Sequence, residues 1–492
     1  MKLDLSPPVL QRPTRVRFGV LGFACALSMV TYLDRVCVAS AAPHIVKALG
    51  LNAVEDLSLA FTAFAFAYAT FEIPTGWLGD VFGPRTTLIR IVLWWSLFTA
   101  VTGFVGMTLP GGIVLGLTAL VVIRFLFGIG EAGAYPNITR ALHNWFPFQE
   151  RGVAQGAVWF AGRLMGGLTP LVLLVLIEGL PRTMIDPGAA SADFLVTPIL
   201  DWRQAFWAFG AIGTVWCLLF ALWFRNRPEE KATVNAAELA LIGEHKHAEA
   251  GAHGGVPWRK LITSRNLWAL CLMYFCASYG WYFNITYLPS FLEEQYGVEK
   301  TSLVGALYKG GPLWVGAMAC LTGGFLTDRF IRRTGNRKWG RRLFGLFGHG
   351  LCGLCYLACL FAPSVFWFFA AISMAAFFND MTMGSAWATC QDIGRRYAAI
   401  VAGCMNTVGN LGGAAAGSLT GLILKMSLAS HVAADGLNPE KLTGAEKAAG
   451  HVLGYQINFV TFAAVYAVAV VLWLWIDPTR PVAPDSKPPP VA

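Results

Sequence analysis

Long apolar runs alternate with shorter polar stretches along the whole chain. A helix needs about 20 mainly apolar residues to cross the hydrocarbon core of a bilayer. Twelve runs meet this requirement to within a few residues, and they predict an all-α polytopic membrane protein. The predicted spans are 18–40, 57–79, 86–108, 113–136, 150–177, 203–224, 266–292, 302–328, 343–361, 364–389, 396–425 and 452–476.

The longest polar stretch between spans divides them into two groups of six. We therefore predict an N-terminal six-helix bundle over residues 1–224, a cytoplasmic linker over 225–265 and a C-terminal six-helix bundle over 266–492. Within the linker, AAELALIGEH at 236–245 is expected to form a short amphipathic helix on the membrane surface.

The two groups of spans resemble each other. Gly76-Trp-Leu-Gly-Asp80 follows the second span, and Gly324-Phe-Leu-Thr-Asp328 follows the eighth, 248 positions later. Small-residue tracts recur at almost the same offset, GRLMGG at 162 and GNLGGA at 409. A duplicated six-helix unit with pseudo-symmetry explains both recurrences, and such repeats enclose a central substrate site.

Composition and charge agree with a membrane setting. The chain is 56% apolar and 13% charged, with a mean hydropathy of +0.55. Most of the 37 Lys and Arg residues fall on one side of the predicted topology, which places both termini in the cytoplasm of a cell whose inner (plasma) membrane holds the protein. This anchoring near anionic lipid explains the net charge of +9, so no nucleic-acid partner is expected.

Several kinds of chemistry are not expected. Ten of the eleven cysteines fall inside predicted spans and Cys390 lies one residue beyond the tenth, which argues against an extracellular disulfide framework. His245, His247 and His253 lie in the linker without a fixed partner, so they predict no metal site. No glycine-rich loop ending in Lys-Ser/Thr is present, which argues against an ATP-driven pump. GSAWAT at 384–389 lacks a convincing base, and we expect neither enzymatic activity nor a cofactor.

Charged side chains occur in two spans where a bilayer disfavours them. Asp34 and Arg35 lie in the first span, and Arg124 and Glu131 lie in the fourth. A charge near the bilayer centre costs at least a few kcal/mol, so such residues face a protein interior or a water-filled cavity. Arg124 and Glu131 share a helix face because they are about two turns apart. Asp34 points about 100° away from Arg35, so it is expected to pair with Arg124.

Short motifs carry a resemblance to a known family. GWLGDVFGPR, the twelve spans and the long central linker resemble the major facilitator superfamily over nearly the whole chain. TYLDR, RFLFGIGEAGAYPN followed by WFPFQERG, and SAWATCQDIGRRYAAIVAGCMNTVGNLGG resemble the anion:cation symporter family within it. That family includes proton-coupled sugar-acid carriers and the vesicular glutamate and sialic acid carriers.

The resemblance implies roles for the intramembrane charges. Glu131 matches the acidic coupling residue of the family, and a desolvated carboxyl holds a proton until an arginine approaches it. Asp34 and Arg124 are expected to take part in this proton coupling. Arg35 matches the arginine that binds the substrate carboxylate, for which a rigid guanidinium fork is suited. The alternatives are a permanently paired, structural Glu131 and a static network of all four charges.

Other residues are expected to line the central cavity. Tyr32 and Tyr68 could offer hydroxyl groups to a polar substrate or could be packing aromatics. Arg163 could add a second anion contact or be structural; sugar-acid carriers tend to have glutamine near this point, so Arg163 leaves a more anionic substrate open. The candidates that match cavity positions in the second half are Trp387, Asn406 and Asn410, although asparagine can equally join helices.

The repeated Gly and Asp motifs are expected to form a gate. Carboxylates near helix ends can bind basic groups or helix termini of the opposite bundle in one state and release them in another. The gate candidates are Gly76, Asp80, Arg85 and Asp328, with Glu72 in support. Lys309 and Asp380 could pair with each other or join the cavity.

Together these features predict a monomeric secondary active transporter that moves a small organic anion with protons by alternating access. An exchanger or exporter of organic anions is the alternative within this class, because sequence gives no direction of transport. A non-transporting sensor and a membrane-embedded enzyme are less consistent with Glu131 and with both gate motifs.

Overall fold

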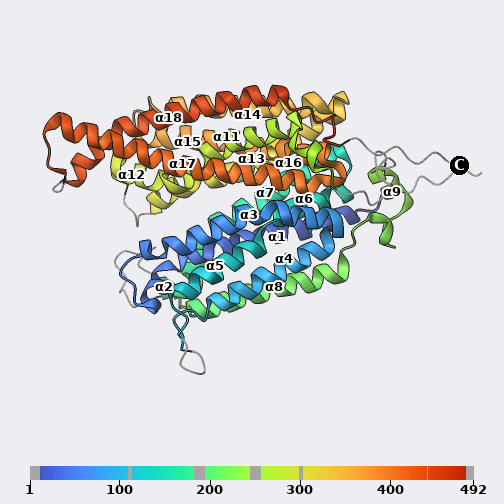
Figure 1. The fold of residues 1–492 in the computed structure, drawn as a ribbon, viewed down its shortest axis with the longest axis horizontal. Coiled ribbons are helices and arrows are strands. Elements are labelled where there is room, and N and C mark those ends of the chain that lie inside the picture. Colours follow the sequence, from blue (N-terminus) through green and yellow to red (C-terminus); the bar gives the residue numbers. More distant parts are fainter. Residues whose placement is uncertain are drawn as a thin grey trace, which may run out of the picture.

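The computed structural model describes residues 12–108, 114–181, 194–243, 256–298, 303–439 and 442–483. Long helices run roughly side by side along the longest axis of the molecule (Figure 1). Helices up to α8 form one half, and helices from α11 onward form the other. We call the end that carries α9 the linker end, and the end that carries α2 and α12 the far end.

The first half contains eight helices within the described residues. They are α1 Val16–Ser40, α2 Ala42–Leu49, α3 Ser58–Phe82, α4 Pro84–Thr102, α5 Leu117–Glu131, α6 Ala134–Trp145, α7 Arg151–Leu173 and α8 Trp202–Trp223. A two-stranded antiparallel hairpin, β1 Leu180–Pro181 and β2 Phe194–Val196, precedes α8. The short helices α9 Ala236–Gly243 and α10 Trp258–Ile262 follow in the linker.

The second half repeats this plan with longer helices. They are α11 Arg265–Thr286, α12 Leu288–Tyr296, α13 Leu303–Thr334, α14 Arg337–Cys359, α15 Val365–Met381, α16 Met383–Gly394, α17 Ala398–Asp435 and α18 Gly444–Trp475. Each of the twelve predicted spans corresponds to one of these helices or to a consecutive pair. The eighth and eleventh extend beyond their predicted ends, because no residue breaks α13 before Gly335 or α17 before Gly436, which both have positive φ.

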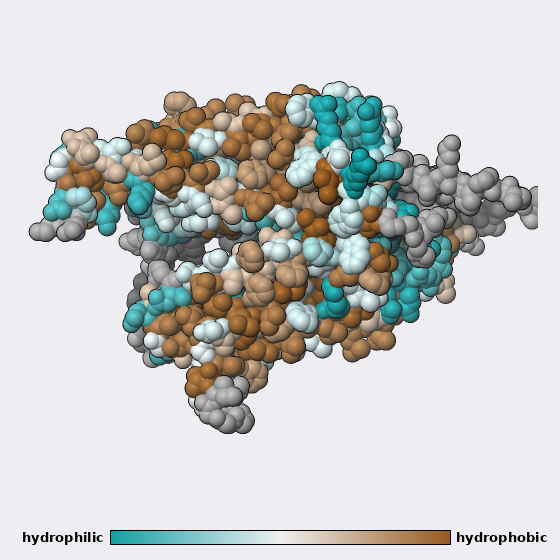
Figure 2. Space-filling model, in the orientation of Figure 1, coloured by the Kyte–Doolittle hydropathy of each residue, from teal (hydrophilic) through white to brown (hydrophobic). Residues whose placement is uncertain are grey.

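Seven helical segments of the described chain are long and apolar enough to cross a membrane by their own composition, and one of them, 365–435, contains two predicted spans. The remaining predicted spans, in α3, α4, α11 and α13, are of similar length but more polar. The sides of both halves are largely apolar, and hydrophilic residues gather at the linker end (Figure 2). This distribution suits a bundle whose flanks face lipid.

Two predicted spans are broken at matching places. The fourth divides after Glu131, where Gly133 takes a left-handed φ of 83° before α6 begins. A Cβ at this glycine would lie 2.6 Å from the side chain of Thr75, so the close approach of α3 also requires glycine. The tenth span divides after Met381, one residue beyond Asp380. Each break therefore places a carboxylate at or next to a helix end.

The two halves meet along two seams. In the first seam α3 packs against α17, and in the second seam α7 packs against α13 and α16. One hydrophobic cluster, which includes Trp145 and Trp387, spans both halves toward the linker end. At the far end each half has a separate cluster, and Figure 2 shows the surface hollowed between them. The halves are thus joined at the linker end and parted at the far end.

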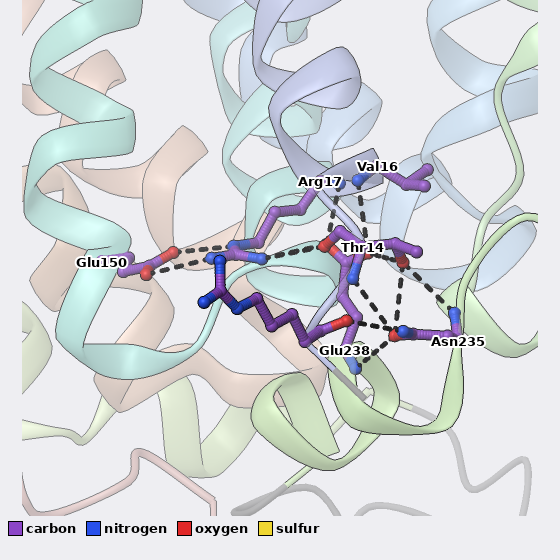
Figure 3. Close-up of polar contacts among 7 residues, drawn as sticks. Thr14, Val16, Arg17, Glu150, Asn235 and Glu238 are labelled. Carbon is purple, nitrogen blue, oxygen red and sulfur yellow. Dashed lines mark hydrogen bonds and ion pairs between the residues drawn. The ribbon is translucent and has the colours of Figure 1, made fainter. Parts of the chain in front are cut away.

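The linker is fixed to the start of the first span (Figure 3). Glu238 of α9 is fully buried and accepts hydrogen bonds from the backbone N–H groups of Val16 and Arg17, both at 3.2 Å. The Arg17 guanidinium bridges Glu238 at 3.0 Å and Glu150 at 2.9 Å. The predicted linker helix forms as α9, and Glu238 fixes it to the start of the first span. His245, His247 and His253 lie outside the described residues.

Candidate functional site

An ion pair between the first and fourth spans lies at the centre of the first half. Arg35 donates to Oε1 of Glu131 through Nε at 3.1 Å and through Nη2 at 2.6 Å. The other oxygen, Oε2, is buried and has no hydrogen-bond partner among the described residues. The Arg35 side chain is 29% exposed, whereas that of Glu131 is 1% exposed. The arginine therefore reaches open space, and the carboxylate lies behind it.

Aromatic rings hold the Arg35 guanidinium from the sides. Its carbon lies 4.6 Å from the ring centre of Tyr68, 5.6 Å from that of Phe64 and 5.9 Å from that of Tyr32. Ring faces attract a cation, so they orient the guanidinium without competing for its N–H donors. The structure thus brings the rings of Tyr32 and Tyr68 to Arg35, while the Tyr68 hydroxyl accepts a hydrogen bond from Nδ2 of Asn406 at 3.5 Å.

The expected pairing of Asp34 with Arg124 is wrong in this structure. Both carboxylate oxygens of Asp34 are buried without a hydrogen-bond partner in the described part of the chain. Arg124 instead lies over the rings of Phe64 and Phe127, at 4.6 and 4.5 Å from their centres. Helix geometry predicted that Asp34 and Arg124 face each other. In the structure the Arg124 guanidinium instead contacts aromatic side chains that lie between the spans.

A second intramembrane ion pair joins the two halves. Arg163 of α7 contacts Asp380 of α15 through Nε to Oδ2 at 2.5 Å and Nη2 to Oδ1 at 2.9 Å. The suggested pairing of Lys309 with Asp380 is therefore wrong, and Lys309 pairs with Glu293 at 2.9 Å. This pair joins the start of α13 to α12 within the second half.

Glu72 forms a third buried polar cluster, in the first seam. The Glu72 carboxylate accepts hydrogen bonds from Nδ2 of Asn406 and, at 3.4 Å, from Nδ2 of Asn410; Thr407 Oγ1 lies at 3.5 Å. No ion pair to Glu72 occurs among the residues that the structure describes. Asn406 and Asn410 therefore join α17 to α3 in this state, which was the alternative to a cavity role.

Trp387 lies one aromatic ring away from Arg163, because Trp159 packs between them. It is fully buried, donates from Nε1 to the Tyr274 hydroxyl at 3.2 Å, and packs beside Tyr135 and Trp159 in an aromatic cluster. It touches no open space in this conformation. The expected cavity role of Trp387 stays a prediction for another conformation.

Each gate aspartate lies at the first turn of a helix from the opposite half. Asp80 accepts hydrogen bonds from the N–H groups of Ala399 and Ile400 at the start of α17, at 3.2 and 2.8 Å. Asp328 accepts from the N–H groups of Gly152 and Val153 at the start of α7, at 3.1 and 2.7 Å. Free N–H groups and the helix dipole favour a carboxylate at this point.

The motif glycines allow these approaches. A Cβ at Gly76 would lie 2.7 Å from the carbonyl oxygen of Ala399, and Gly324 lies similarly against Gly152. Both motifs are inside the last turns of α3 and α13, not after them as predicted. Arg85 does not reach the opposite half: it donates from Nη2 to the carbonyl of Ala221 at 2.5 Å, within its own half.

Sequence reasoning missed the basic residues that surround the gate. Arg341 lies 3.0 Å from Asp328 and 3.3 Å from Asp392, and Arg151 lies 2.9 Å from Asp392. Arg140 lies 3.6 Å from Asp80. Arg341 belongs to a run of basic residues that positive-inside counting treats alike, so no sequence signal separated it from its neighbours.

Comparisons with known proteins agree with this geometry. The model of the Major Facilitator Superfamily matches residues 24–417. The chain is 33% identical over 487 residues to the probable sulfoacetate transporter SauU of Cupriavidus necator, covering 97% of this chain and 98% of that protein. It is 28% identical over 426 residues to the probable galactarate/D-glucarate transporter GudP of Pseudomonas putida, covering 84% and 87%.

A solved structure shows the same fold. The Escherichia coli fucose:proton symporter FucP matches with a TM-score of 0.64 at 14% identity, covering 94% of this chain and all of that one. The predicted all-α fold of twelve spans in two bundles is confirmed, as is a transporter rather than an enzyme in a multi-pass membrane protein. The chain belongs to the Major Facilitator Superfamily.

Proposed function

We propose that the protein is a proton-coupled symporter of a small organic anion. The observation that carries the proposal is the Arg35–Glu131 pair, in which the arginine is partly exposed and the carboxylate is buried. A substrate carboxylate that reaches Arg35 competes with Glu131 for the same N–H donors. Protonation of Glu131 at its unpartnered Oε2 weakens its hold on Arg35 and leaves the guanidinium for substrate.

The same pair explains why protons and substrate would move together. With Glu131 ionised and no substrate bound, Arg35 is satisfied within the protein. Substrate without a proton would leave the buried Glu131 charge unpaired, which is costly in a dry site. Bound substrate therefore favours a protonated Glu131, and loss of the proton favours substrate release. Asp34 adjoins Arg35 in the chain and Arg124 lies two helical turns before Glu131, so both can adjust this exchange.

The described state fits one stage of alternating access. We propose that the linker end is cytoplasmic, because basic residues concentrate there, so the hollow at the far end opens outward. The division into bundles at 1–224 and 266–492 with a linker at 225–265 belongs to the same proposal. Asp80 and Asp328 then hold the cytoplasmic side closed, and their release opens it.

The names of the relatives support an organic acid as substrate. Sulfoacetate, galactarate and D-glucarate are all acids with more than one acidic group, and each is named for a protein that this chain resembles over most of its length. Arg35 has aromatic rings at its sides and is partly exposed, so its N–H donors can bind a carboxylate or sulfonate group of the substrate. Of the two directions of transport, uptake follows from a proton gradient directed into the cell.

The decisive experiment separates coupling from binding. Glu131→Gln resembles a permanently protonated carboxyl, so Arg35 stays available but no proton can be released. In proteoliposomes with an imposed pH gradient, net uptake of labelled organic acid should collapse, while exchange of labelled for unlabelled substrate persists. The matched control is Glu229→Gln, an exposed linker carboxylate that should leave both activities unchanged. A Gln variant at 131 that still concentrates substrate would move the proton site to Asp34 or Asp380.

A second substitution tests substrate contact. Arg35→Lys keeps the positive charge but loses the planar fork that binds two oxygens. Loss of a charged hydrogen bond should weaken substrate binding by about 1.5 to 3 kcal/mol. Isothermal calorimetry on the purified protein measures this change, and binding at wild-type affinity in the Lys variant would exclude Arg35 as the clamp.

A further inference from the structure

The Arg163–Asp380 pair resembles the Arg35–Glu131 pair in chemistry, and its carboxylate occupies the position that matches Glu131, although Arg163 is in the fifth span and Arg35 in the first. Asp380 follows Glu131 by 249 positions, against 248 between the two gate aspartates. Both carboxylates lie at the break of matching spans, where α5 ends at Glu131 and α15 ends one residue after Asp380. The duplication has therefore left one arginine-bound carboxylate in each half.

The Tyr32 ring of the first span lies between Arg35 and the stretch of α7 that carries Arg163. The ring centre is 5.9 Å from the Arg35 guanidinium carbon. Gly162 and Gly166, on either side of Arg163 in α7, leave room for the Tyr32 ring, since a Cβ at either would overlap it. Tyr32 therefore contacts Arg35 on one side and the backbone around Arg163 on the other.

The partners of Arg163 come from the opposite half. Its guanidinium carbon lies 3.7 Å from the ring centre of Trp281 in α11, and its carboxylate partner is on α15. Asp380 is further held by Nδ2 of Asn379 at 3.0 Å and packs against Gly316 of α13, where a Cβ would lie 2.6 Å from its Oδ2. The Asp380 carboxylate is therefore held by residues of its own half, whereas Arg163 contacts both halves.

We propose that Arg163 is a second anion-binding group, occupied by Asp380 until a substrate with two acidic groups displaces it. This inference rests on the proposed function. One acidic group of the substrate binds Arg35, and the second, a carboxylate or sulfonate, binds Arg163 on the other side of Tyr32. The substrate class is then a short organic dianion. A monoanion satisfies Arg35 alone and leaves Arg163 on Asp380.

The position of this pair between halves gives binding a mechanical consequence. Arg35 and Glu131 both belong to the first half, so exchange at that pair does not alter a contact between halves. Displacement of Asp380 removes a direct contact between α7 and α15 at the second seam. A dianion therefore loosens the second seam, and a monoanion does not.

The test compares acids that differ only in one charge. Purified protein in detergent is titrated with succinate and its monoamide succinamate, and with sulfoacetate and its amide sulfoacetamide, and binding is measured as a rise in the thermal unfolding midpoint. The variants are Arg163→Gln with Asp380→Asn, which replaces the ion pair by two amides, and the single Arg163→Lys. Their unfolding without ligand is measured first, so that a folding defect is recognised.

The wild-type protein should bind each dianion about 10- to 100-fold more tightly than its monoamide, the effect of a charged hydrogen bond. The double variant should lose this preference and keep the affinity for monoamides within about threefold, whereas Arg35→Lys weakens both classes. Equal binding of dianion and monoamide by the wild type, or equal losses of both in the double variant, would overturn the inference and leave the proposed function standing. Absence of any protection or uptake would overturn both.

Discussion

The two seams place a carboxylate at the same point but hold it in different ways. In the first seam Asp80 has two backbone N–H donors and Arg140 at 3.6 Å, and Arg396 also acts on its charge. In the second seam Asp328 also has two backbone N–H donors, and Arg341 lies closer, at 3.0 Å. Arg341 also reaches Asp392 at 3.3 Å, so one fully buried arginine bridges two carboxylates in the second seam.

The same difference continues toward the centre of the molecule. Glu72 of the first seam is held by two asparagine amides, whereas the second seam contains the Arg163–Asp380 ion pair. Duplication of the six-helix unit explains why both seams contain carboxylates. Later divergence of the two halves explains why different side chains bind these carboxylates. We infer that the first seam is joined mainly by hydrogen bonds and can part at low cost, while the second is joined by charges that need a replacement partner when they separate.

The largest expected effect concerns Arg341, whose side chain is fully buried. Arg341→Ala leaves Asp328 without its arginine in a dry site, and breaking a buried charge network costs about 3 to 5 kcal/mol. The matched change in the first seam is Arg140→Ala, whose side chain is 15% exposed and whose pair should be worth about 1 kcal/mol or less. The free energy of unfolding is measured by denaturant titration in detergent. Equal losses of unfolding free energy in the two variants would contradict the inference that charges hold the second seam more strongly than the first.

The gate aspartates provide the next comparison. Asp328→Asn leaves Arg341 with only Asp392 and should favour opening of the linker end by about 1 to 3 kcal/mol, the value of hydrogen bonds to charged groups. Asp80→Asn should favour opening less, because its arginine is farther away. The measurement is thiol labelling of single cysteines placed at the linker end and at the far end, in a background without the native cysteines. Labelling that is unchanged by either variant would exclude both aspartates from the gate.

Hydrophobic patterning predicted the fold closely because each spanning helix must form its backbone hydrogen bonds internally and must itself be apolar enough to lie in the bilayer. The breaks after Glu131 and Met381 were missed, since glycine and small residues are common in membrane helices and, of the two breaks, only the first has a glycine with a left-handed φ, Gly133. Helix ends were also misjudged where α13 and α17 continue beyond the apolar run.

The sequence singled out the charged residues of the candidate site, but it predicted their ion-pair partners less well. Intramembrane charges are rare enough that Arg35, Glu131 and Arg163 stood out by position alone. Their partners depend on which helices face each other and on which rings lie between them. Arg124 illustrates this limit, because Phe64 and Phe127 receive its guanidinium in place of Asp34.

The smallest expected effect is at Glu72, and it tests the first seam at its centre. Glu72→Gln keeps one oxygen acceptor for the amides of Asn406 and Asn410 but removes the charge. Since no cation pairs with Glu72 within the described residues, the loss should be about 0.5 to 1.5 kcal/mol in the free energy of unfolding. The matched variant is Asp380→Asn, which leaves the buried Arg163 unpaired and should cost about 3 to 5 kcal/mol. A Glu72→Gln loss as large as that of Asp380→Asn would mean that the first seam is also held by charge, and the two seams would then open with similar difficulty.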